Sequence, residues 1–275
     1  MTTGCTVIVS TYRRPDALQL VLEGLRRQDD DDFEVLVADD GSGEAPRAVV
    51  EPFEHDPPGR GLRHVWQPDE GFRLARVRNL AAREADGERL VFLDGDCIPR
   101  RGFVRGHRRC RPGRATCGRR ALLSERTTRR TIDALPDVRV PDLVGQAALR
   151  LRGGINRMPS LTDHPLARFE PALSWRRFRG MNHGVHRSDY EAVGGNDQSF
   201  EGWGYEDSDL AIRLGNHGVR LIPAGRGSTV LHLWHPEADR TLERENLRRL
   251  EELQRSGRIR ARLGIDPPDE PTDAA

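Results

Sequence analysis

Short apolar runs alternate with amphipathic segments through the first hundred residues. Runs rich in Val, Leu and Ile predict four strands, at 6–11, 33–40, 62–67 and 89–96. Apolar residues at helical spacing predict helices between them, at 14–28 and 73–85. Nearly continuous apolar strands separated by helices indicate a parallel sheet that is covered on both faces.

The pattern becomes less regular after about residue 141. The stretch 180–197 predicts a strand, a short helix and a glycine turn, and a further helix is expected to start near Glu206. Two late strands are expected within 219–224 and 228–235. A charged helix is expected from Leu242 to Arg255, and the polar tail 266–275 is expected to be disordered.

Composition excludes several kinds of chemistry. The chain has 44 basic and 43 acidic residues, and this balance argues against a nucleic-acid binder. It contains no lysine, so a phosphate-loop lysine and a Schiff-base lysine are both excluded. The four cysteines form no C-x-x-C pair. No signal peptide is recognised, and no apolar run is long enough to span a bilayer. We therefore expect reduced thiols in a cytoplasmic protein.

Carboxylates follow two of the predicted strands. One strand ends in Asp39 and Asp40, and another runs into Asp94-Gly95-Asp96. Ligands bind beyond the carboxyl ends of parallel strands, so these acids are expected at one rim of the sheet. Two close carboxylates repel each other unless a cation intervenes, and Mg²⁺ and Mn²⁺ prefer oxygen ligands. A turn that uses Asp and Gly for backbone reasons is the alternative, but a second acidic strand end favours a metal site.

Four segments, taken in order, resemble family 2 glycosyltransferases. They read "VIVSTYRRPDALQLVLEGLRRQ", "VLVADDGS", "DEGFRLARVRNLAAREADGERLVFLDGDC" and "GWGYEDSDL". The sequence resembles chondroitin-polymerase-type domains in particular, together with the carboxyl-terminal motif of β-1,4-galactosyltransferases and polypeptide N-acetylgalactosaminyltransferases. The resemblance covers roughly residues 5 to 235.

This resemblance implies an α/β protein with the GT-A fold, in which helices flank a mostly parallel central sheet. It implies one catalytic domain over 1–240, with a nucleotide-sugar-binding half at 1–99 and an acceptor-binding half at 100–240. Residues 241–275 then form the C-terminal helix and tail. The implied activity is metal-dependent, inverting transfer from a nucleotide-diphosphate sugar, expected to be a UDP-sugar, to an acceptor hydroxyl. The acceptor would be a glycan, a polysaccharide precursor, a lipid-linked sugar or a small molecule, and the cofactor Mn²⁺ or Mg²⁺.

The resemblance also assigns donor-binding roles. Thr11 and Arg13 would flank the nucleotide, and Asp40 would contact the uracil or ribose. The donor-binding set is completed by Arg78, Asn79, Asp94 and Trp203. Arg78 and Asn79 would support the base and diphosphate. Asp94 would lie near the ribose and Asp96 would be the more direct metal ligand, so both belong to the expected metal site.

The segment "GWGYEDSDL" supplies candidates for acid–base chemistry. The resemblance makes Asp207 the general base and Glu206 a residue that shapes the acceptor pocket. A position near a helix start stabilises negative charge there, although acids also occur in helix first turns without any such role. A glycine-rich approach with a large aromatic favours the functional interpretation. Because no separate nucleophile is evident, single displacement with inversion is expected.

Two late histidines are candidates for the third metal ligand. In a strand, residues three apart point to opposite faces, so His232 and His235 are not expected to reach one ion unless the strand ends between them. The resemblance favours His232 as the ligand, with His235 facing the diphosphate or a loop. Imidazole nitrogen would complete a mixed oxygen and nitrogen site.

Residues 100–130 carry twelve arginines and one acid, Glu125. A solvated, mobile surface is the first interpretation of such a run. The alternative is contact with an acidic acceptor or with the inner face of a membrane. The sequence between 100 and 175 matches no motif, and Tyr205 stands where relatives often have a second glycine.

Two other functions fit part of this pattern. A nucleotidyltransferase would also place acidic pairs at strand ends, but it would normally need a basic glycine-rich loop and a lysine. A non-catalytic module that binds nucleotide sugars or carbohydrate would not need an acid at Asp207.

Overall fold

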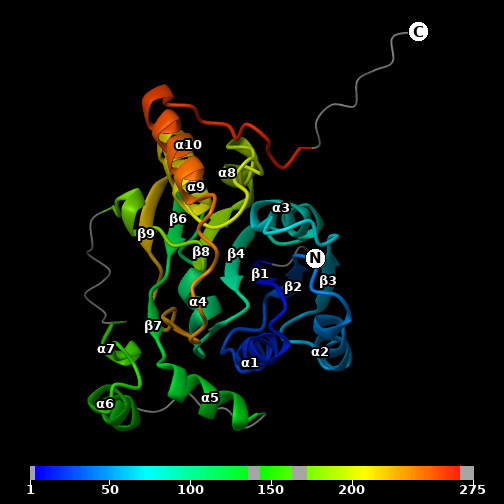
Figure 1. Cartoon of the computed structure of the whole chain (residues 1–275), viewed down its shortest axis with the longest axis vertical. Coiled ribbons are helices and arrows are strands. Elements are labelled where there is room, and N and C mark those ends of the chain that lie inside the picture. Colours follow the sequence, from blue (N-terminus) through cyan, green and yellow to red (C-terminus); the bar gives the residue numbers. More distant parts are fainter. Residues whose placement is uncertain (1–3, 136–142, 163–171, 267–275) are drawn as a thin grey trace.

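Seven strands form the central sheet of the protein, a computed structural model that describes residues 4–135, 143–162 and 172–266 (Figure 1). Their order is β3-β2-β1-β4-β8-β6-β9. Their bounds are β1 (Thr6–Thr11), β2 (Glu34–Asp39), β3 (Leu62–Trp66), β4 (Arg89–Asp94), β6 (Arg114–Cys117), β8 (Asn182–His186) and β9 (Arg220–Pro223). The four N-terminal strands lie where the sequence predicts them.

Strand directions make the sheet mostly parallel. Strands β3, β2, β1 and β4 run parallel to one another. Strand β8 pairs antiparallel with β4 on one side and with β6 on the other, and β9 is parallel to β6. Only β8 is therefore reversed among these seven strands, and the predicted fold class is confirmed.

A second sheet of three short strands brings late residues back to the acidic strand end. Its order is β5 (Cys97–Ile98), β10 (Val230–His232) and β7 (Arg120–Leu122). Strand β10 is antiparallel to β5, with His232 opposite Cys97. This pairing places His232 beside the segment that follows β4.

Helices cover the central sheet (Figure 1). Their bounds are α1 (Pro15–Arg26), α2 (Glu44–His55), α3 (Leu74–Glu84), α4 (Phe103–His107), α5 (Glu125–Asp133), α6 (Leu143–Leu151), α7 (Pro159–Thr162), α8 (Arg187–Ala192), α9 (Glu206–Asn216) and α10 (Glu243–Ser256). Helices α1, α3, α8, α9 and α10 match the predictions closely. Helix α2 was not predicted, and it contains Pro52, a residue that disfavours helix interiors.

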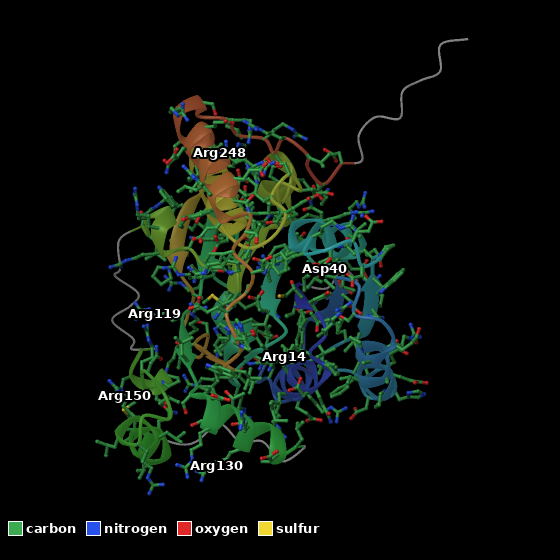
Figure 2. The ribbon with its side chains drawn as sticks, viewed as in Figure 1. Arg14, Asp40, Arg119, Arg130, Arg150 and Arg248 are labelled. Carbon is green, nitrogen blue, oxygen red and sulfur yellow. The ribbon has the colours of Figure 1, made fainter. Side chains whose placement is uncertain are left out.

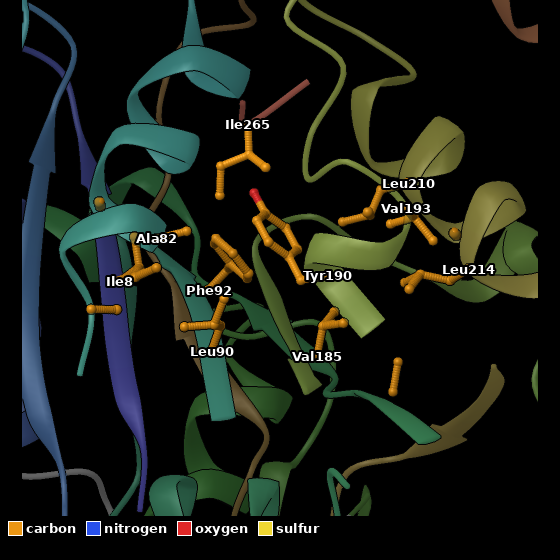
Figure 3. Close-up of a cluster of buried hydrophobic side chains, with 14 of the residues drawn as sticks. Ile8, Ala82, Leu90, Phe92, Val185, Tyr190, Val193, Leu210, Leu214 and Ile265 are labelled. Atoms are coloured by element: carbon orange, nitrogen blue, oxygen red, sulfur yellow. The ribbon is translucent and has the colours of Figure 1, made fainter. Parts of the chain in front are cut away.

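Alternate residues of the buried strands face two separate cores. Ile8 packs in one core with residues of α3, α8 and α9, and Figure 3 shows Ile8, Phe92 and Tyr190 in this cluster. Val7 and Val9 pack in the other core with Leu18 of α1. Because both faces of the sheet are covered, every position of β1 is buried, and this explains the uninterrupted apolar run from Val7 to Val9 at its centre.

The arginine-rich segment is built into the fold. It forms α4, β6, β7 and the start of α5. Arg108 donates to Asp30 at 2.6 Å and to the Asp32 carboxylate at 3.2 Å. Arg105 lies 2.7 Å from Asp29. The segment therefore belongs to both sheets and several of its cations pair with acids, while the side chains of Arg105 and Arg129 are 60% and 76% exposed, as expected of a solvated surface.

The remaining expectations concern thiols, the membrane and the tail. Cys5, Cys97, Cys110 and Cys117 are all buried and unpaired, in agreement with reduced thiols. Within the described residues, no helix combines the length and apolar character that a bilayer crossing requires. Of the tail 266–275, residues 267–275 lie outside the described part of the chain.

Candidate active site

The Asp94-Gly95-Asp96 segment turns tightly over the end of β1. Ser10 lies opposite Asp94 in the parallel register, and the Gly95 N–H donates to the Ser10 carbonyl at 2.7 Å. A Cβ on Gly95 would lie 2.7 Å from that oxygen and 3.2 Å from the Thr11 Cβ. The glycine between the two carboxylates is therefore required by close backbone approach.

We expect Gly95→Ala to lower the free energy of unfolding by about 1–3 kcal/mol, since an added methyl must displace β1. Gly61→Ala is the matched control, because a Cβ at Gly61 meets no atom within 4 Å. Denaturant unfolding of both variants measures the difference. Equal stability of the two variants would contradict the conclusion that close backbone approach requires glycine at position 95.

A buried arginine organises the carboxylates beyond β4. Arg78 of α3 is 1% exposed, and its Nη2 donates to Asp94 Oδ1 at 2.7 Å. Its Nε donates to the Ser10 hydroxyl at 3.1 Å, while Nη1 has no hydrogen-bond partner among the described residues. Burial raises the pKa of Asp94, and the Arg78 charge opposes this shift. Arg78 thus holds Asp94, and its Nη1 is buried without a hydrogen-bond partner among the described residues.

Gly180 connects this arginine to the predicted base. Its carbonyl accepts from Arg78 Nη2 at 3.0 Å, and its N–H donates to Asp207 Oδ2 at 2.8 Å. Burial and the neighbouring Asp207 charge raise the pKa of Glu206 to about 7. The first turn of α9 therefore faces Asp94 and Arg78. Gly180 had no recognisable signal, because its part in the site is played by backbone atoms.

The approach to α9 requires unusual backbone angles. Gly202 and Gly204 have φ values of 68° and 113°, which glycine adopts without strain. Tyr205 also has a positive φ, 69°, which is unusual for a residue other than glycine. Trp203 is 38% exposed, and its ring lies 4.7 Å from the Arg240 guanidinium carbon. The glycine-rich sequence is thus needed for the turn that presents Glu206 and Asp207.

Both histidines reach Asp96. The distance from Asp96 Oδ2 is 3.4 Å to His232 Nε2 and 3.6 Å to His235 Nε2. Strand β10 ends at His232, so strand geometry no longer applies to His235. The strand therefore ends between the two histidines, which is the condition under which both rings are expected to reach one ion.

This group suits a divalent cation. Ligand atoms of Asp96, Cys97 and His232 all lie within 4.8 Å of one another. Burial, with the carboxylates of Asp96 and Asp94, raises the pKa of the Cys97 thiol well above its usual value in the absence of a cation. The remaining carboxylate oxygen and imidazole nitrogens match the preferences of Mn²⁺. The Asp94 carboxylate lies outside this group and bonds to Arg78, so its direct ligation stays a prediction.

The other predicted donor residues lie along the same rim or beneath it. Asp40 is buried, and its Oδ2 accepts from the Arg73 N–H at 2.8 Å, where α3 begins. Figure 2 labels Asp40 below this helix and Arg14 beside α1. Thr11 is buried at the end of β1. Asp40 therefore fixes the helix that carries Arg78.

Two predicted residues face away from the acids. The Arg13 side chain is 62% exposed and pairs with Asp69 at 2.6 Å. Asn79 is 1% exposed, its amide oxygen accepts from Tyr190 at 2.7 Å, and its amide nitrogen donates to the Asn196 carbonyl. Because Asn79 is buried, it can influence a bound nucleotide sugar only through Tyr190 and Asn196. Its neighbour Arg78 faces the site.

A mostly parallel sheet with an acidic pair at the end of its fourth strand matches the GT-A class of glycosyltransferase folds. Residues 6–107 match the family described as glycosyl transferase family 2, and residues 162–235 match the N-terminal domain of galactosyltransferase. The predicted resemblance is confirmed: the chain has a glycosyltransferase family 2 region followed by a galactosyltransferase region.

Curated relatives carry similar descriptions. Validoxylamine A glucosyltransferase of Streptomyces hygroscopicus subsp. jinggangensis (strain 5008) is 32% identical over 78% of this chain and 52% of its own length. Chondroitin synthase of Escherichia coli is 28% identical over 78% of this chain and 32% of its own length. The chain thus spans about half the length of the former and a third of the latter.

Solved structures share the fold. Residues 1–349 of S. aureus TarS in complex with UDP align with a TM-score of 0.58 at 16% identity, over 95% of this chain and 67% of that one. The mannosyltransferase PcManGT from Pyrobaculum calidifontis, in complex with GDP-Man and Mn²⁺, aligns with a TM-score of 0.54 at 22% identity, over 83% of this chain and 56% of that one.

Proposed function

We propose that this chain is a metal-dependent, inverting glycosyltransferase that moves a sugar from a UDP-sugar to an acceptor hydroxyl. The observation that carries the proposal is the meeting of two acidic groups. Asp94 ends β4 and Asp96 follows it, Glu206 and Asp207 open α9, and Arg78 lies between them. Relatives described as glucosyltransferase and chondroitin synthase, and a structural neighbour that holds UDP, support this assignment.

The leaving nucleotide diphosphate requires positive charge. Asp96 and His232, with His235 beside them, would hold Mn²⁺ or Mg²⁺, and this cation would act as a Lewis acid toward the diphosphate. The structural neighbour with GDP-Man and Mn²⁺ supports a metal at such a site. Arg78 holds Asp94 in place through its 2.7 Å hydrogen bond.

The acceptor proton must pass to a base. Asp207 is assigned this role, because the Gly180 N–H fixes its Oδ2 while the carboxylate stays close to Asp94. Glu206 is assigned to the acceptor pocket, where its pKa of about 7 allows it to donate or to accept a hydrogen bond. In this scheme residues 1–99 bind the donor and residues 100–240 shape the acceptor side.

Turnover of a panel of nucleotide sugars with Mn²⁺ tests this function. A transferase releases UDP and forms a glycoside, a nucleotidyltransferase releases pyrophosphate, and a non-catalytic binding module turns over neither product. Pyrophosphate release, or binding without turnover of any donor, would contradict the proposal.

The first product should have inverted configuration at the anomeric carbon. Asp207 and Glu206 form one acidic cluster opposite the metal group, with no separate nucleophile assigned. Proton NMR of the product immediately after transfer shows the anomeric configuration. A product with retained configuration would contradict single displacement.

A further inference from the structure

Arg120 contacts His232 on the side opposite to Asp96. It begins β7, which runs parallel to β10 in the second sheet. The Arg120 Nη1 lies 3.1 Å from His232 Nδ1, while Nε2 of the same ring lies 3.4 Å from Asp96 Oδ2. The imidazole is therefore held between a guanidinium and a carboxylate.

These contacts define where the hydrogen of His232 resides. A guanidinium offers only donors, so Nδ1 of His232 must accept and carries no hydrogen. The ring hydrogen is then on Nε2, where it faces the Asp96 carboxylate. This tautomer satisfies both neighbours.

A cation held by Asp96 and Nε2 of His232 would reverse this arrangement. A divalent metal binds the lone pair of a neutral imidazole nitrogen, so Nε2 would have to carry no hydrogen. The ring hydrogen would then be on Nδ1, where it would face the N–H groups of Arg120. Two donors repel each other, so the guanidinium would have to leave the ring.

We propose that Arg120 is a metal-responsive diphosphate-binding residue, an inference that rests on the proposed function. Without the cation it holds His232. With the cation bound, its guanidinium turns from Nδ1 to the diphosphate oxygens of the donor, which the planar fork of N–H groups suits.

The second sheet brings Arg120 to this position, because β10 pairs with β5 on one side and with β7 on the other. Cation and diphosphate binding are coupled, because each favours the released position of the same side chain.

Replacement of Arg120 should affect the two ligands in opposite directions. Arg120→Met removes the group that favours the metal-free tautomer, so the variant should bind Mn²⁺ alone at least as tightly as wild type. With saturating Mn²⁺, its affinity for UDP should fall by about tenfold or more, the scale of a lost charged hydrogen bond. Arg120→Lys should recover part of this loss. A purely structural residue would weaken binding of both ligands.

Calorimetry with Mn²⁺ alone, and with UDP at saturating Mn²⁺, measures both effects. Arg130→Met is the matched control, since Arg130 lies exposed on α5 and should leave both affinities unchanged. An Arg120→Met affinity for UDP within twofold of wild type, or weaker binding of Mn²⁺ alone, would overturn the inference. If either result is found while the wild-type enzyme still releases UDP from a UDP-sugar, the proposed function stands and only the inference about Arg120 fails. Wild type that binds no UDP contradicts both.

A second measurement needs no variant. Long-range proton–nitrogen NMR of the metal-free wild-type protein, labelled at histidine, reports the tautomer of each ring. His232 should carry its hydrogen on Nε2. A hydrogen on Nδ1 would rule out donation from Arg120 and overturn the inference.

Discussion

Asp207→Asn should lower turnover by about a hundredfold or more, the usual scale for a lost general base, while UDP binding with Mn²⁺ stays nearly unchanged. The change keeps the shape of the side chain and its ability to accept from the Gly180 N–H at 2.8 Å. It removes the negative charge that would receive the acceptor proton. Steady-state transfer rates and calorimetry with UDP separate these effects.

Two further variants distinguish chemistry from helix stabilisation. Glu245→Gln removes an acid from the first turn of α10 and should leave transfer unchanged. Glu206→Gln tests the neighbouring carboxylate, whose pKa of about 7 also suits proton transfer. If Glu206→Gln is inactive and Asp207→Asn is active, the roles of the two acids are reversed.

Removal of the cation or of its ligands should abolish tight donor binding. The Asp94 and Asp96 carboxylates repel a diphosphate unless a cation lies between them, so UDP should bind only weakly in EDTA. Asp96→Asn and His232→Ala should each weaken Mn²⁺ binding by at least about tenfold. Removal of a residue that only hydrogen-bonds to a metal ligand already weakens metal binding by about tenfold or more, so removal of a ligand itself should cost at least as much. Calorimetry with Mn²⁺ and with UDP measures both losses.

The histidines also allow an internal comparison. His235→Ala should weaken Mn²⁺ binding as well, because its Nε2 lies 3.6 Å from Asp96 Oδ2, nearly as close as that of His232. His217→Ala, an exposed histidine at the end of α9, is the control and should have no effect. Wild-type affinity for Mn²⁺ in His232→Ala would remove His232 from the site. Undiminished UDP affinity in EDTA would remove the acid pair.

The donor-side framework could be predicted from the sequence, because the signals there are local. Apolar runs are typical of strands buried on both faces, and the run from Val7 to Val9 lies at the centre of β1 (Thr6–Thr11). Acids directly after β4 and at the start of α9 needed no tertiary information. Helix α2 was not predicted, because Pro52 disfavours a helix at this place in the sequence. In the structure Val50 and Phe53 of this helix are buried, and their packing stabilises the helix despite the proline.

Contacts between distant segments were decided only by the tertiary structure. Gly180 is 102 residues from Arg78, and it joins that arginine to Asp207 through backbone atoms that no side-chain motif reveals. Arg120 is 112 residues from His232, within an arginine-rich run whose composition indicated only surface. The approach of His235 to Asp96 depends on where β10 ends. The spacing of residues along the sequence shows which face of a strand or helix they occupy. The contacts described above depend instead on how the two sheets pack together at the end of β4.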